Sequence, residues 1–301
     1  MQGKWVTING SHVFIKDGQT VEEALAERDK QHADLTDRMV KQVKWVQAQA
    51  RYKRDENGKL VKIKPKQYCT DLLRKGLETR DKDEELFEKA VEHNVDELML
   101  KDTSGSWLSP GNNVDGKIVL HISIAGTKVG ICTNYFHEVG HAIDLIDKNN
   151  NFLSSTFVSP THGKTLIDMF MEEFKGIDLE LLHDEFDYLN GNKHYKDIED
   201  NEQRRYVAQH CEEATTSFVD MIQAIHGNDV ARKIGGWLPH AEYYFNGLKG
   251  KKHAGTELFA ELCESYHSDK NELFYELIKQ YCPKTVEIYH EIMERRREEW
   301  K

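Results

Sequence analysis

Residues 137–141 read His-Glu-Val-Gly-His, a pattern that could bind a divalent metal ion and transfer a proton. On an α-helix, residues four positions apart lie on the same face, about one turn from each other. His137 and His141 could therefore bind one zinc ion, while Glu138 points toward a water molecule beside it. The segment predicts a zinc-dependent peptidase in which Glu138 is the catalytic base.

The residues around this motif favour a helix. Thr133 or Asn134 could cap its N-terminus, and residues 142–146 continue the helical spacing of apolar side chains. Gly140 lowers helix propensity, yet it would allow a neighbouring backbone to approach closely. The alternative interpretation is an amphipathic helix that carries two surface histidines.

A catalytic zinc site needs a third protein ligand and one position that stays open. The metzincin pattern, which continues with a glycine and a third histidine, is excluded because residues 142–147 read Ala-Ile-Asp-Leu-Ile-Asp. Glu257 and Glu261 lie four positions apart on a later helix, so one could bind the metal while the other hydrogen-bonds a ligand histidine. We favour Glu257 as the ligand. Asp144 could alternatively orient the imidazole of His141.

Three segments together resemble the catalytic domain of the anthrax lethal factor family of zinc endopeptidases: residues 136–144, 257–261 and 283–285, which read FHEVGHAID, ELFAE and PKT. The match covers about residues 105–175 and 253–297, with the motifs in the same order. The resemblance implies that Glu257 is the third ligand. It also implies a mostly helical zincin domain with a small sheet.

The chain departs from that family at the group that stabilises the oxyanion. The family has a tyrosine just upstream of the third ligand, but the residue at that spacing is Gly250, and a long insert separates Asp144 from Glu257. Within the insert, Tyr244 or His240 could donate a hydrogen bond to the tetrahedral oxyanion, and we prefer Tyr244.

Other segments resemble proteins encoded among phage head-morphogenesis genes. These are residues 218–222, residues 235–245 and the hairpin at residues 5–15. The resemblance implies a phage or prophage origin, with phage capsid or portal proteins as partners besides a protein or peptide substrate.

The remaining elements follow from local patterns. In a zincin, the strand at residues 117–122 would lie at the sheet edge, where an extended peptide could add by backbone hydrogen bonding, and we favour this position over the alternative of a buried strand. Thr20 and Glu23 form a capping box ahead of a helix. A hairpin is expected at residues 5–15 around Asn9-Gly10, a turn at 55–58, a strand at 59–64 and a turn at 148–151, with helices at 21–50, 68–75, 83–93, 164–174, 199–226, 256–267 and 272–297.

Composition limits the partners and the compartment. The formal net charge of −11 argues against nucleic-acid binding, which needs a basic face. The five cysteines lack close pairing, so reduced thiols are expected. The chain shows neither a signal-peptide pattern nor an apolar run of membrane-spanning length, which predicts no membrane partner and a cytoplasmic or virion-associated protein.

These patterns predict an α+β, predominantly helical protein. We expect an N-terminal hairpin and linker at residues 1–30, a helical region at 31–104, and a zincin-like domain at 105–301 with a helical insert at about 176–250. The expected activity is that of an endopeptidase with Zn²⁺ as its cofactor. The alternatives are a non-catalytic structural protein of a phage head and a toxin that cleaves a host protein.

Overall fold

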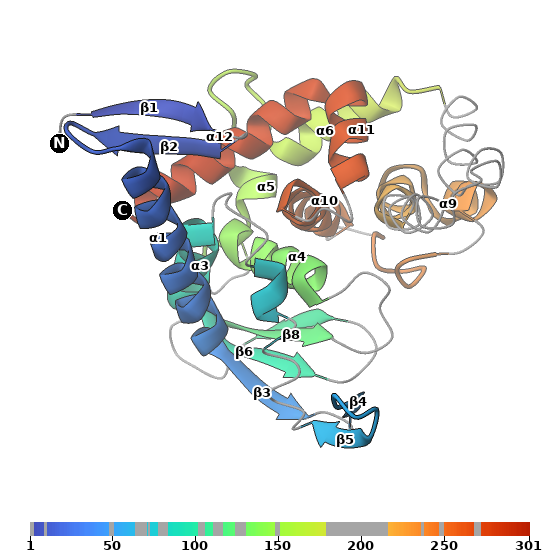
Figure 1. Cartoon of the computed structure of the whole chain (residues 1–301). Coiled ribbons are helices and arrows are strands. Elements are labelled where there is room, and N and C mark those ends of the chain that lie inside the picture. Colours follow the sequence, from blue (N-terminus) through green and yellow to red (C-terminus); the bar gives the residue numbers. More distant parts are fainter. Residues whose placement is uncertain are drawn as a thin grey trace, which may run out of the picture.

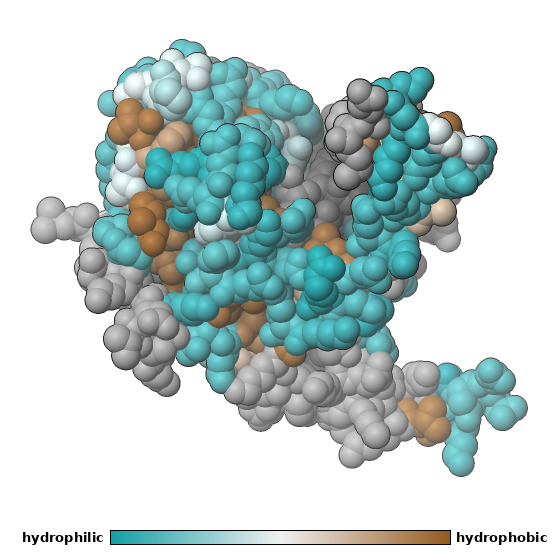
Figure 2. Space-filling model, turned by 90° about the vertical axis from the view of Figure 1, so that its left-hand side faces the viewer, coloured by the Kyte–Doolittle hydropathy of each residue, from teal (hydrophilic) through white to brown (hydrophobic). Residues whose placement is uncertain are grey.

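The structure is a computed structural model, and the residues that it describes are 3–8, 11–47, 51–63, 71, 73–77, 84–101, 106–110, 117–123, 131–147, 151–178, 216–235, 238–246, 250–267 and 272–301. The described part is mostly helical with small sheets, which confirms the predicted α+β class. On the face shown in Figure 2, hydrophilic residues dominate its surface. Among the described residues, no helix is both long and apolar enough to cross a membrane.

A four-stranded mixed sheet forms one layer of the molecule. Its strand order is β3 (Val43–Gln47), β6 (Val95–Lys101), β8 (Ile118–Ser123) and β7 (Trp107–Pro110). β3, β6 and β8 are parallel, whereas β7 pairs antiparallel with β8 and forms an edge of the sheet. The sheet therefore joins strands from the segments 31–104 and 105–301.

The prediction that residues 117–122 form an edge strand is wrong. β8 pairs with β6 on one side and with β7 on the other. Five of its six residues are buried, as expected for a strand covered on both faces. The edge strands of the described sheet are β3 and β7, and β7 lies in a segment whose glycines and proline do not resemble a strand.

Helices cover the sheet in successive layers. α4 (Ile131–Asp144) packs on β8 and also on α10 (Gly250–His267), so that it lies between the sheet and α10. Figure 1 shows α6 (Leu166–Lys175) and α12 (Pro283–Glu299) beyond α10 on the side away from the sheet. The remaining helices are α1 (Val21–Gln42), α3 (Glu84–Asn94), α5 (Leu153–Thr156), α9 (Asn228–Gly235) and α11 (Glu272–Tyr281).

The N-terminal predictions are largely confirmed. β1 (Gly3–Ile8) and β2 (Ser11–Lys16) form the expected antiparallel hairpin, and Thr20 and Glu23 form the expected capping box. The helix is shorter than predicted, because α1 ends at Gln42 and β3 follows. Residues 43–47 read Val-Lys-Trp-Val-Gln, and valine and tryptophan favour a strand.

A second small hairpin follows β3. β4 (Arg51–Arg54) and β5 (Leu60–Ile63) pair antiparallel around the predicted turn at residues 55–58. β5 lies within the strand predicted at residues 59–64, and β4 was not predicted.

The predicted C-terminal helix at residues 272–297 is two helices, α11 and α12. The helix breaks at Cys282, because Pro283 has no N–H to donate and therefore begins a new helix rather than continuing the old one. α3 and α6 match predicted helices within two residues at their starts and ends. α10 ends at His267 as predicted, but it begins at Gly250, six residues before the predicted start. Residues 199–215 of the predicted 199–226 helix lie outside the described part, as do residues 148–150 of the predicted turn and residues 68–70 and 72 of the predicted 68–75 helix. Residues 216–226, 71 and 73–75 are helical, as predicted.

Side chains from other elements fix the C-terminal end of α4. Asn94 Nδ2 donates to the carbonyl oxygens of Ala142, at 2.7 Å, and Leu145, at 3.1 Å. Arg296 Nε donates to the carbonyl oxygen of Ile143 at 2.7 Å. These contacts satisfy carbonyl groups that a helix end leaves without partners, so the last turn of α4 is held in place.

Gly140 allows α4 and α10 to pack closely. A Cβ atom at position 140 would lie 2.9 Å from Cys263 Cβ and 3.2 Å from Ala260 Cα. Neither atom is at the end of a flexible side chain, so one of the two helices would have to shift.

We expect Gly140→Ala to lower the free energy of unfolding by about 1–3 kcal/mol, because overpacking outweighs the gain in helix propensity. Urea denaturation followed by circular dichroism measures the change. Gly255→Ala on α10 is the matched control, since its Cβ would meet Ile167 Cβ and Ser154 Oγ at 3.3 Å and should cost less. A Gly140→Ala protein as stable as the parent would contradict this explanation.

Candidate metal centre

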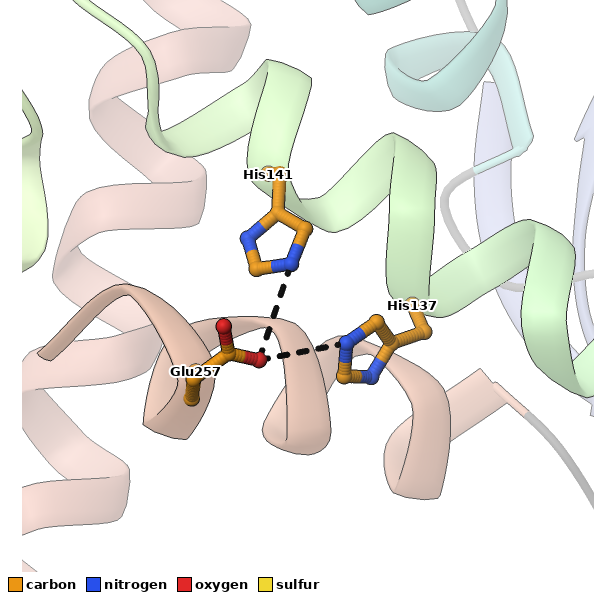
Figure 3. A group of neighbouring side chains, drawn as sticks. All are labelled: His137, His141 and Glu257. Atoms are coloured by element: carbon orange, nitrogen blue, oxygen red, sulfur yellow. Dashed lines mark ion pairs between the residues drawn. The ribbon is translucent and has the colours of Figure 1, made fainter. Parts of the chain in front are cut away.

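Three predicted ligands lie together between α4 and α10. Glu257 Oε2 is 3.4 Å from His137 Nε2 and 3.7 Å from His141 Nε2, and Figure 3 shows both imidazoles facing this one oxygen. Zinc binds nitrogen and oxygen ligands at about 2.0–2.1 Å, so ligand atoms at two corners of a tetrahedron lie about 3.3–3.4 Å apart. The three side chains could therefore hold one tetrahedral metal ion.

The burial of α10 also favours a bound cation. Glu257, Glu261 and Glu264 point to the same side of this helix, with residue exposures of 5%, 7% and 9%. Burying several carboxylates costs much free energy unless positive charge lies close to them. A divalent ion beside Glu257 would supply such charge.

The protonation of Glu257 and His141 fits metal binding. Burial raises the pKa of Glu257, but His141 and His137 outweigh burial and hold this pKa well below the usual carboxyl range. Burial lowers the pKa of His141 to about 4, so its imidazole is neutral near pH 7, as a metal ligand must be. In the described part of the chain, His141 Nδ1 has no hydrogen-bond partner.

Glu264 is the carboxylate closest to Nδ1 of His137, and it was not predicted as a site residue. Glu264 Oε2 lies 3.2 Å from His137 Nδ1, whereas Glu261 Oε1 lies at 3.8 Å and Glu261 also accepts a hydrogen bond from Ser217. Burial lowers the pKa of His137, but Glu257 and Glu264 outweigh burial and raise it well above its usual value, so a metal ion that binds His137 must displace a proton from it. Glu264 is seven positions after Glu257, so extending the helical spacing by one turn could have found it.

Two minor predictions about α4 are wrong. Asp144 does not orient His141, because its two carboxylate oxygens accept hydrogen bonds from Ser154 N at 2.7 Å and Ser154 Oγ at 2.6 Å. Burial raises the pKa of Asp144 to about 7. Thr133 and Asn134 do not cap the helix, because α4 begins earlier, at Ile131.

Both candidate oxyanion donors lie beside Glu257, in contact with each other. The Tyr244 hydroxyl donates to Glu257 Oε1 at 2.6 Å. The ring of His240 stacks on that of Tyr244, with centroids 4.3 Å apart and planes 8° from parallel. His240 Nε2 lies 3.1 Å from Asp220 Oδ1, forming an ion pair when the imidazole is protonated.

Asp220 and Gln223 position His240, and neither was predicted to do so. They lie one turn apart in the helical residues 216–226 and both are buried. Gln223 Oε1 accepts from His240 N at 3.1 Å, and Gln223 Nε2 donates to His240 O at 3.0 Å. Asp220 and Gln223 are the two polar residues in the otherwise apolar residues 218–225, and this is the sequence signal that could have revealed their role.

Glu138 is buried next to the metal ligands. Its Oε2 atom has no hydrogen-bond partner among the described residues. Burial raises the pKa of Glu138 to about 8; the nearby His137 opposes this shift and Glu257 adds to it. A carboxylate that gains a proton near neutral pH is suited to general acid–base chemistry.

We expect Glu257→Ala to weaken zinc binding by more than about 100-fold, because even residues that only orient a ligand contribute about 10–100-fold. Competition with a zinc chelator of known affinity measures the change. Glu276→Ala, which removes an exposed carboxylate on α11, should bind zinc like the parent. Unchanged affinity in Glu257→Ala would remove Glu257 from the ligand set.

We expect Glu264→Gln to weaken zinc binding by about tenfold, since the amide holds His137 less strongly than the carboxylate does. The same chelator competition applies. Glu261→Gln is the matched comparison and should have the smaller effect, because Glu261 is farther from His137. The opposite order would assign the positioning role to Glu261.

No family model, curated protein or solved structure matches this chain. The geometry of the site shows a cluster of buried histidine and glutamate side chains that could bind a metal ion.

Proposed function

We propose that this protein is a zinc-dependent endopeptidase with a zincin-like catalytic domain. The convergence of His137, His141 and Glu257 supports the proposal, since Glu257 Oε2 lies 3.4 and 3.7 Å from the two imidazole nitrogens, and Glu138 is buried beside them. A structural zinc site fills all four positions with protein ligands. In the described part of the chain, this group comprises three ligand atoms, which suits a catalytic centre.

Glu138 is the proton-transfer group in this proposal. A divalent cation, when bound, supplies Lewis-acid activation of water and of the scissile carbonyl group. Glu138 takes a proton from the attacking water and later gives it to the departing amine. A cation bound at the neighbouring ligands would favour the ionised form of Glu138 for the first step.

His240 is the better candidate for the oxyanion donor. The hydroxyl of Tyr244 already donates to Glu257, so its proton is directed away from a substrate. Burial lowers the pKa of His240, but Asp220 outweighs burial and raises it, which favours the imidazolium form. An imidazolium has two N–H donors, so one can pair with Asp220 while the other reaches the oxyanion.

The edge strand β7 is the proposed binding site for the peptide backbone. β7 pairs with β8 on one side, and α4 packs against β7 as well as β8. On its other side β7 has no partner strand among the described residues, and an extended peptide that adds there would form backbone hydrogen bonds and present alternate side chains to the protein. In this proposal β7 binds the substrate peptide, a role that was predicted for the strand at residues 117–122.

We expect Glu138→Gln to reduce peptide cleavage by about 10²–10⁴-fold while leaving zinc content unchanged, because the amide cannot accept the proton. Cleavage of a peptide library and elemental analysis of the same samples measure the two effects. Glu92→Gln, an exposed substitution on α3, should match the parent in both. A Glu138→Gln protein that cleaves peptides at the parental rate would contradict the proposed mechanism.

A further inference from the structure

We propose that the Tyr244 hydroxyl restricts Glu257 to a single metal-binding oxygen and thereby keeps one coordination position free. Tyr244 is then a positioning residue that acts through Glu257. The proposal rests on the metal centre of the proposed function, but it concerns the metal site without substrate.

The two carboxylate oxygens of Glu257 have different neighbours. Oε2 faces the Nε2 atoms of His137 and His141, as Figure 3 shows, whereas Oε1 accepts the hydrogen bond from Tyr244 at 2.6 Å. A carboxylate can bind a metal ion through one oxygen or through both. Binding through both would place Oε1 where a catalytic zinc site must stay open.

Tyr244 is held in place by contacts that do not involve a metal. Its ring lies against two imidazoles, with centroid distances of 4.3 Å to His240 and 4.8 Å to His253. His253 Nδ1 also lies 2.9 Å from the carbonyl oxygen of Tyr244. Because His253 is one turn before Glu257 on α10, the same helix positions both the hydroxyl and its acceptor.

The burial of Glu257 makes this hydrogen bond important. The side chain of Glu257 is 7% exposed, so solvent cannot readily replace the hydroxyl as a donor to Oε1. In Tyr244→Phe, Oε1 would lose its donor while the ring remains in place. The closest compensating positive charge is then the cation bound at Oε2, so Oε1 should turn toward the cation.

The test compares the parent, Tyr244→Phe and Tyr243→Phe, each loaded with Co²⁺ and titrated with azide. Azide binds an open position on the cobalt ion and changes its visible spectrum. We expect azide to bind Tyr244→Phe about tenfold or more weakly, because Oε1 occupies that position. Tyr243→Phe is the matched control, since Tyr243 is the adjacent residue and is 77% exposed, and it should bind azide like the parent.

X-ray absorption of the zinc-loaded proteins provides a second, independent measurement. When both carboxylate oxygens bind, the distance from the metal to the carboxylate carbon shortens, and this should appear in Tyr244→Phe alone. The proposal would be overturned if Tyr244→Phe had the same azide affinity and the same metal–carbon distance as the parent. It would also be overturned if Tyr244→Phe no longer bound the metal ion. A parent protein that binds neither Co²⁺ nor Zn²⁺ would overturn the proposed function as well, so the two failures are distinguishable.

Discussion

The attraction between one carboxylate and two imidazoles across a helix–helix interface is the interaction on which the candidate centre depends. Glu257 Oε2 lies within 3.7 Å of both His137 and His141, and all three side chains are mostly enclosed by protein. Such an arrangement is costly for charges in isolation and favourable when they compensate one another. The packing of α4 against α10 and the protonation states of the three side chains therefore depend on each other.

The rest of the fold keeps that interface in register. Gly140 brings α4 close to α10, while Asn94 and Arg296 bind the carbonyl groups at the C-terminal end of α4. The sheet supports α4 from the opposite side through β8. A ligand on a helix restrained at its side and its end has little freedom to move, which suits a site that must hold its geometry to within fractions of an ångström.

The sequence predicted the parts of this site that depend on local spacing. The pairing of His137 with His141 and the position of Glu257 on a second helix follow from helical periodicity and the chemistry of zinc. Glu264 follows the same helical spacing and could have been predicted with them. Asp220 and Gln223 stand out as polar residues in an apolar stretch, but their contact with His240 arises from packing between segments that are distant in sequence. The edge position of β7 was missed for the same reason, since strand order is a property of the whole sheet and β7 is too short to show a clear alternating pattern.

The contact of Arg296 with α4 has a consequence for how the protein is made. Arg296 donates to the carbonyl oxygen of a residue 153 positions earlier in the chain. During synthesis, α4 and its two histidines leave the ribosome long before α10 and α12 exist. Because Glu257 lies on α10, the candidate metal centre can assemble only after that helix has been synthesised, and the contact of Arg296 that holds α4 forms later still.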